Sequence, residues 1–165
     1  MLLSLEDLRE HLAYSAWASR RLVVAASELT AAELERDFAT ADRSVLGTMV
    51  HIFAADRLWV ARLRGAPLSR FVTPDDHRFT VLENDWPEVH RQWGDWLNGL
   101  DDAAAIADFA YQDLEGRDWN QPIWQLVLHV VNHATQHRGQ VSGFLRAMGR
   151  TPPVLDLVAF YRQKS

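Results

Sequence analysis

Apolar residues recur at three- and four-residue intervals along four long stretches of the chain, a spacing typical of amphipathic helices. Ser4 and Ser44 provide N-cap signals for the first two stretches. Pro87 would disrupt the interior of a helix in the third stretch. A helix start at Asp85, which places the proline in the first turn, is the simpler explanation. The predicted long helices cover residues 4–29, 44–63, 82–100 and 122–148.

Shorter elements are predicted between and after these helices. Thr30 and Glu33 form a second capping pattern and indicate a short helical turn. Two prolines and mixed polar residues predict a loop over residues 65–80, and residues 108–120 predict a small hairpin or an extended excursion. Pro122 is suited to the N1 position of the last long helix, and a short extra helix is expected over residues 155–162. We therefore expect an all-α four-helix bundle that forms a single domain over residues 1–165.

Composition and charge narrow the possible functions. The 165-residue chain has a formal net charge of -5, which argues against binding a nucleic acid by neutralising its phosphates. It has no cysteine, so neither a disulfide nor a thiolate metal ligand is possible. No signal peptide or membrane-spanning stretch is recognised. We expect a cytoplasmic protein without a nucleic-acid or membrane partner.

Histidines at apolar helical positions are the main candidates for chemistry. His129, His133 and His137 follow one another at four-residue intervals, so neighbouring rings share a helical face. The two outer rings would lie about 12 Å apart along the axis, too far to bind one ion together. Spacing alone leaves open which pair forms half of a metal site. His51, on the second long helix, is either a core histidine bonded to a backbone carbonyl or a third ligand.

Four segments resemble the DinB family, and together they span nearly the whole chain in order. The most specific is Leu-His-Val-Val-Asn-His-Ala-Thr-Gln-His-Arg-Gly-Gln, which ends in a His-x-x-x-His-Arg-Gly-Gln element. The resemblance implies a four-helix bundle, often dimeric, in which three histidines bind one divalent metal ion. Carried over by position, those ligands are His51, His133 and His137. The four segments cover residues 14–22, 46–59, 128–140 and 148–157.

A site of three neutral imidazoles has characteristic chemistry. It leaves a divalent ion its full charge and at least one coordination position for water or substrate. In such a setting zinc lowers the pKa of bound water to about 7, or binds and deprotonates a thiol. Imidazole ligands suit several transition metals, of which we expect zinc or nickel.

Several other residues are candidates for a supporting role around this site, each with a plainer structural alternative. Asp56 and Gln140 are within reach of the ligands and could orient their rings. Arg138 could meet an anionic substrate, or be solvated or salt-bridged. His129 could pack in the core or form a hydrogen bond near the ligands. Three aromatic residues have the spacing of core residues and could instead form a pocket wall, namely Tyr14, Trp17 and Trp59.

Two classes of function follow from this interpretation. The first is a metal-dependent enzyme, of hydrolase or thiol-dependent transferase type, that activates water or a low-molecular-weight thiol for an unknown small-molecule substrate. Relatives in the wider superfamily, some of which use small thiols, support this class. The second is a non-catalytic, metal-binding homodimer with a structural or stress-related role. DNA binding is disfavoured by the acidic charge.

Overall fold

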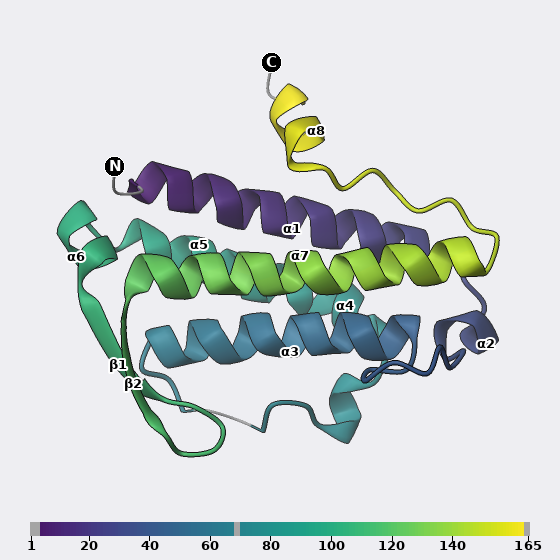
Figure 1. Cartoon of the computed structure of the whole chain (residues 1–165), viewed down its shortest axis with the longest axis horizontal. Helices are drawn as coiled ribbons and strands as arrows, with labels where there is room; N and C mark the ends of the chain where they lie inside the picture. The colour runs from purple at the N-terminus through teal and green to yellow at the C-terminus, as the bar shows by residue number, and fades with distance from the viewer. Residues whose placement is uncertain (1–3, 68–69, 164–165) are drawn as a thin grey trace.

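Four long helices lie side by side in the computed structural model, which describes residues 4–67 and 70–163 (Figure 1). Helix α7 (Ile123–Ala147) packs against both α1 (Leu5–Ser27) and α3 (Val45–Leu63), and α5 (Trp86–Asn98) packs against the same two helices from the other side. The described chain is mostly helical and contains one small two-stranded sheet, which agrees with the all-α expectation. The shorter elements are α2 (Ala31–Leu34), the 3-10 helix η1 (Pro74–Asp76), α4 (Phe79–Asn84), α6 (Asp102–Ile106), β1 (Asp108–Gln112), β2 (Asp118–Pro122) and α8 (Leu157–Arg162).

The capping signals read from the sequence are confirmed at three helix starts. The Ser4 hydroxyl accepts from the backbone N–H of Asp7 at 3.1 Å, while the Asp7 carboxylate accepts from the backbone N–H of Ser4 at 2.9 Å. Thr30 forms the same reciprocal box at the start of α2. Ser44 caps α3 by accepting from Gly47 N at 3.0 Å. Each pairing satisfies N–H groups that a helix start leaves without an intrahelical partner.

One further helix start is confirmed and other boundaries are corrected by the structure. As the position of Pro87 predicted, a helix starts at Asp85, its N-cap, with Pro87 in the first turn, while Leu82 lies in the separate short helix α4. Pro87 cannot donate to the preceding turn, which explains the break between the two helices. The loop predicted over residues 65–80 contains η1 and the first residues of α4, and its residues 68 and 69 lie outside the described residues. The short helix α6 was not predicted, and the last helix begins at Leu157.

The predicted hairpin is present beside α3 and α7. Strands β1 and β2 pair antiparallel, with Asp108 opposite Pro122 and Gln112 opposite Asp118. Pro122 was expected at N1 of the long helix but is its N-cap and the last residue of β2, because α7 begins one residue later. Gly116 in the connecting loop has a φ of 78°, a conformation that glycine adopts without steric cost. The hairpin therefore leads directly into the helix that carries two of the candidate ligands.

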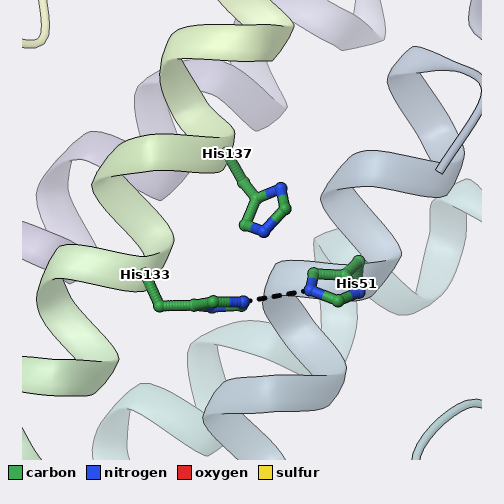
Figure 2. A group of neighbouring side chains, drawn as sticks. All are labelled: His51, His133 and His137. Atoms are coloured by element: carbon green, nitrogen blue, oxygen red, sulfur yellow. Dashed lines mark hydrogen bonds between the residues drawn. The ribbon is translucent and has the colours of Figure 1, made fainter. Parts of the chain in front are cut away.

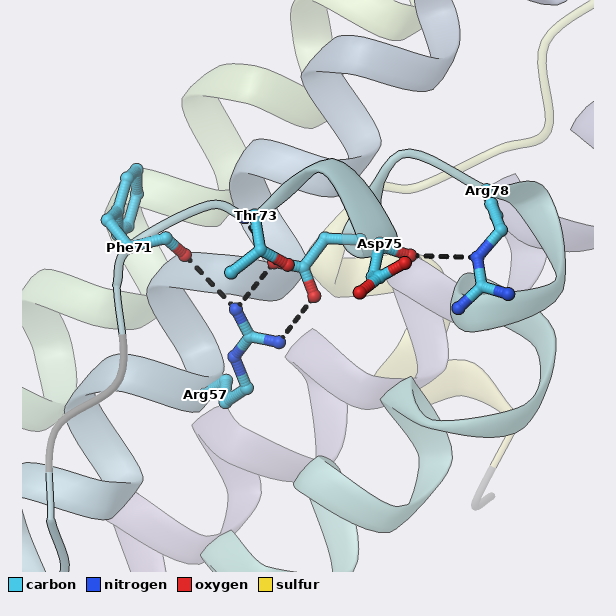
Figure 3. Close-up of polar contacts among 6 residues, drawn as sticks. Arg57, Phe71, Thr73, Asp75 and Arg78 are labelled. Atoms are coloured by element: carbon cyan, nitrogen blue, oxygen red, sulfur yellow. Dashed lines mark hydrogen bonds and ion pairs between the residues drawn. The ribbon is translucent and has the colours of Figure 1, made fainter.

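A hydrogen-bond network centred on Arg57 anchors the segment between α3 and α4 (Figure 3). The guanidinium of Arg57 donates two hydrogen bonds to the Asp76 carboxylate, at 2.6 and 2.8 Å, and a third to the backbone carbonyl of Phe71 at 3.1 Å. The Arg57 hydrogen bonds lower the pKa of Asp76 to about 2. The ring of Phe71 contacts His51 edge-on, with centroids 5.2 Å apart. This ion pair therefore fixes a residue that covers one of the candidate ligands.

The sequence also led us to expect no membrane-spanning stretch and a single domain. None of the helices within residues 4–67 and 70–163 is long and apolar enough to cross a membrane. The largest buried cluster draws side chains from all four long helices. The assignment of residues 1–165 to a single domain stays a prediction.

Candidate metal centre

Three histidine rings converge between α3 and α7 (Figure 2). His51 extends from α3, while His133 and His137 extend from adjacent turns of α7. The Nε2 atoms of His51 and His133 are 3.0 Å apart and share a hydrogen bond. One ligand atom from each of the three rings can be chosen so that all lie within 4.8 Å of one another. Three imidazole nitrogens so arranged form a donor set that could hold a transition-metal ion.

The structure separates His129 from this cluster. Its ring lies next to that of His133, with centroids 5.9 Å apart, and contacts the ring of Trp59 edge-on at 5.5 Å. His137, by contrast, is 4.5 Å from both His51 and His133 between ring centroids. Of the two histidine pairs that spacing left open, the pair His133 and His137 therefore lies beside His51, as the family resemblance implied.

Burial favours the neutral form of His51, His129 and His133 by lowering their pKa values. Burial and the neighbouring histidines, His137 first, lower the pKa of His133 to about 4. Burial also lowers the pKa of His51, against an opposing attraction from the Asp42 carboxylate, and it lowers the pKa of His129. A neutral imidazole is the form that binds a metal. The environment thus favours the ligating protonation state at neutral pH.

Asp42 is a functional candidate that sequence reasoning missed. One of its carboxylate oxygens lies 3.4 Å from Nδ1 of His51 and the other lies 3.6 Å from Nδ1 of His137. A negative charge beside both Nδ1 atoms favours the proton there and leaves Nε2 free as a ligand. Asp42 precedes the N-cap of α3 by two residues, a place where aspartate is common in turns, so nothing in the sequence distinguishes it.

The turn that presents Asp42 is conformationally unusual. Ala39 and Arg43 both have positive φ values, 56° and 63°, which are uncommon for residues other than glycine. Gly47 lies against the same turn, and a Cβ atom added there would be 2.1 Å from the backbone oxygen of Asp42. Only a residue without a side chain fits that contact. Gly47 therefore allows the Asp42 turn to pack against the first turn of α3.

Gln140 contacts the site as the sequence suggested. Its side-chain oxygen accepts a hydrogen bond from Nδ1 of His137 at 2.8 Å. Because the amide oxygen can only accept, the proton of His137 lies on Nδ1 and its Nε2 is available to a metal. Gln140 and Asp42 thus favour the same tautomer of His137.

Asp56 lies between two helices, and this interhelical position was the alternative to a role beside His51. It is 3% exposed and accepts a hydrogen bond from the indole of Trp86 at 2.8 Å. Its carboxylate also lies 3.4 Å from Nε2 of His90, a histidine for which the sequence suggested no partner. The carboxylate therefore links α3 to α5, and it is neither a surface residue nor a hydrogen-bond partner of the candidate ligands.

Arg138 is buried, which corrects the expectation that it is solvated, salt-bridged or available to a substrate. It is 1% exposed and donates to the hydroxyls of Ser15 at 2.9 Å and Thr135 at 2.9 Å. It lies between α7 and α1, because Ser15 belongs to α1. This arginine therefore joins two helices.

Two of the three aromatic candidates for a pocket wall are also remote from the histidines. Tyr14 and Trp17 pack against Phe160 of α8, with ring centroids 5.9 and 5.6 Å away. The Tyr14 hydroxyl donates to the carbonyl of Leu155 at 2.9 Å. Their role is to attach α8 to α1. Trp59 alone lies beside the histidine cluster.

A groove of about 300 Å³ extends from the histidines along α3 and the hairpin. This volume is at the lower end of those observed for small-molecule sites. His51 and His133 line one part of the groove, and Arg62 and Tyr111 line another. Neither Arg62 nor Tyr111 was singled out in the sequence, because the contact between α3 and the hairpin is not visible in either segment alone.

Comparison with known proteins agrees with the geometry. The model of the DinB family matches residues 1–164 of the 165-residue chain. No curated protein matches the sequence closely enough to be counted as a relative.

Proposed function

The chain belongs to the DinB family, and we propose that it is a divalent-metal-dependent enzyme that activates water or a small thiol. The observation that carries this proposal is the convergence of three imidazole rings, from two helices, at the margin of a groove. Three protein ligands leave a coordination position for a reacting group, whereas a structural site is closed by a fourth ligand. The groove gives a small molecule access to that position.

The three histidines suit zinc or nickel, and the residues around them would support such an ion in different ways. An ion bound to three neutral imidazoles supplies Lewis acidity that lowers the pKa of a coordinated water or thiol. Asp42 and Gln140 retain protons on the Nδ1 atoms of the histidines and orient the rings. Phe71 contacts the ring of His51 edge-on and lines the groove beside it. The groove admits the substrate past His129 and Trp59.

Metal analysis combined with activity screening tests the proposal. We expect purified protein to contain close to one divalent ion per chain, and to catalyse either hydrolysis or conjugation of a small thiol in a substrate panel. His51→Ala should lose the ion and the activity together. Asp85→Asn, which changes an exposed residue between α4 and α5, is the matched control and should retain both. Metal-loaded protein that is inert with every substrate class would contradict the enzymatic proposal.

A non-catalytic role is the second candidate, and one observation favours it. The candidate ligands come from two helices that are separated in sequence by residues 64–122, so a bound ion would connect α3 to α7 as a structural brace. In that case His51→Ala should lose most of its thermal stability along with the metal. A catalytic site should lose activity with little change in the stability of the metal-free fold.

We further propose that the four long helices form a DinB-type four-helix bundle and that the protein is a homodimer. The apolar side chains of Val154, Val158 and Tyr161 are 55%, 52% and 41% exposed on and before α8. Burial of such a group against a second copy would be favourable. Light scattering coupled to size-exclusion chromatography should give twice the chain mass of 18.9 kDa, and Val158→Glu should give a monomer. A monomeric wild-type protein would contradict the dimer.

A further inference from the structure

Arg62 is a buried cation that forms no ion pair in the described part of the chain, although the Asp113 carboxylate is close enough to favour its charged form. The residue is 8% exposed, and its guanidinium lies against the rings of Trp59 and Tyr111, 4.6 and 5.1 Å from their centroids. Among residues 4–67 and 70–163 it forms no ion pair, and its Nε has no hydrogen-bond partner. Burying an unpaired charge is costly, and a guanidinium that packs against aromatic rings can still donate hydrogen bonds in its own plane. Arg62 lines the groove.

The other charged residues of the groove already form hydrogen bonds or ion pairs with one another. Both carboxylate oxygens of Asp113 accept hydrogen bonds within the hairpin: one from the backbone N–H groups of Glu115 and Arg117, the other from the side chains of Arg117 and Trp119. Glu115 in turn pairs with Arg117 at 3.0 Å. The hairpin therefore satisfies its own charges, and Arg62 remains the cation that can bind an incoming anion.

Arg62 and the histidine cluster lie at different points along the same groove. Eleven residues of α3 separate His51 from Arg62, which corresponds to about 16 Å along the helix axis. Trp59 and His129 lie between them, in ring contact at 5.5 Å. A ligand that touches both ends must therefore be elongated, with an apolar middle that fits against these rings.

We infer that Arg62 recognises the carboxylate of an elongated small molecule whose opposite end, a thiol, lies at the histidine cluster. This inference rests on the proposed function and names the substrate class of the same site. A guanidinium binds a carboxylate through two parallel hydrogen bonds. Asp113 and Glu115 nearby disfavour a doubly charged phosphate, which a carboxylate with one negative charge avoids. Burial lowers the pKa of Arg62, and a bound anion would compensate that cost.

Cobalt-loaded protein provides a direct binding measurement. Cobalt(II) gives visible absorption bands that depend on its ligands, and a thiolate that joins it adds a charge-transfer band. The protein is titrated with mercaptohexanoate and with mercaptohexanol, which share a thiol and a chain length but differ in the carboxylate. We expect the carboxylate compound to bind at least about tenfold more tightly, the gain typical of a hydrogen-bonded pair with a buried charge.

Variants assign that preference to Arg62. Arg62→Met keeps an apolar chain of similar length, and it should reduce the preference to about one. Arg62→Lys should retain part of it, because the charge remains without the bidentate geometry. Arg64→Met is the matched control, since Arg64 is an exposed arginine two residues away, and it should bind like wild type. Mercaptoacetate is too short to reach Arg62, so its affinity should be the same in wild type and Arg62→Met.

The outcomes separate this inference from the proposed function. A normal cobalt spectrum and thiolate band, with equal affinities for the two long probes or a preference that survives Arg62→Met, would overturn the role of Arg62. Absence of a thiolate band with every probe would refute thiol activation itself. In that event, calorimetric titration of metal-free protein with hexanoate still tests Arg62, because wild type should bind it more tightly than Arg62→Met. Equal binding would overturn the inference.

Discussion

The Nδ1 atoms of His51 and His137 both lie near the carboxylate of Asp42, so one side chain influences two rings. Asp42→Asn removes the charge but keeps the shape. We expect metal affinity to fall by roughly 10–100-fold, the range seen when hydrogen-bonding partners of metal-ligating histidines are changed. Competition against a chelator of known affinity measures this loss, with Asp85→Asn as an exposed control. An unchanged affinity in Asp42→Asn would show that the carboxylate does not orient the ligands.

The low pKa of His133 predicts how metal-free protein responds to acid. The folded-state pKa is about 4, whereas an unperturbed histidine titrates near 6.5. Between these values the unfolded chain binds a proton that the folded chain does not, so the free energy of unfolding decreases as pH falls from about 6.5 to about 4. Urea unfolding of the metal-free protein across this range should show the decrease. It should be smaller in His133→Gln, and parallel curves for the two proteins would contradict the assignment.

Prediction from sequence identified the three histidines that lie together, but not the residues around them. Helical spacing limited the metal pair to two choices, and the family resemblance then selected His133 and His137. Asp42 escaped notice because its proximity to these rings arises only when the turn before α3 meets α7. The burial of Arg138 was not predicted because a long charged side chain usually reaches water, whereas here one of its terminal nitrogens donates to hydroxyls of α1 inside a helix interface.

The start of α3 depends on the absence of a side chain at Gly47. Gly47→Ala would place a methyl group 2.1 Å from the Asp42 backbone oxygen, so the turn must move. We expect a loss of about 1–3 kcal/mol of stability, as for overpacked sites, together with weaker metal binding. Gly94→Ala makes the same change in α5, where nothing lies within 4 Å, and should stabilise the protein by about 0.5–1 kcal/mol. Chemical denaturation measures both, and two variants of equal stability would contradict this interpretation of the turn.

Helix starts were easier to predict than helix interruptions. Capping residues act over three or four positions, so Ser4, Thr30 and Ser44 could be recognised locally. Pro87 likewise marked the helix start at Asp85, whereas the separate short helix α4 was not recognised because apolar spacing continues from Leu82 into α5. The hairpin was foreseen, but its position beside α3 depends on contacts such as that between Trp59 and Tyr111, with centroids 5.2 Å apart.

For the whole molecule, ligands from two helices predict that metal binding stabilises the fold. A ligand that binds only the folded state, at 100 times its dissociation constant, adds about 2.7 kcal/mol to the free energy of unfolding. For a chain of this size that corresponds to a rise in Tm of roughly 5–10 °C. Differential scanning calorimetry with and without zinc or nickel measures the rise. His51→Ala should abolish it, and an equal rise in that variant would place the ion elsewhere.

The hairpin tip completes its own hydrogen bonding through Asp113, and it contributes no ligand to the histidine cluster. The part of the groove wall that the hairpin supplies is therefore separable from the candidate ligands. Residues 113–117 can be exchanged as a cassette, or diversified in a library, to change which molecules are admitted while the metal-binding helices stay untouched. For an engineer, this short turn is the place to begin when retargeting the protein.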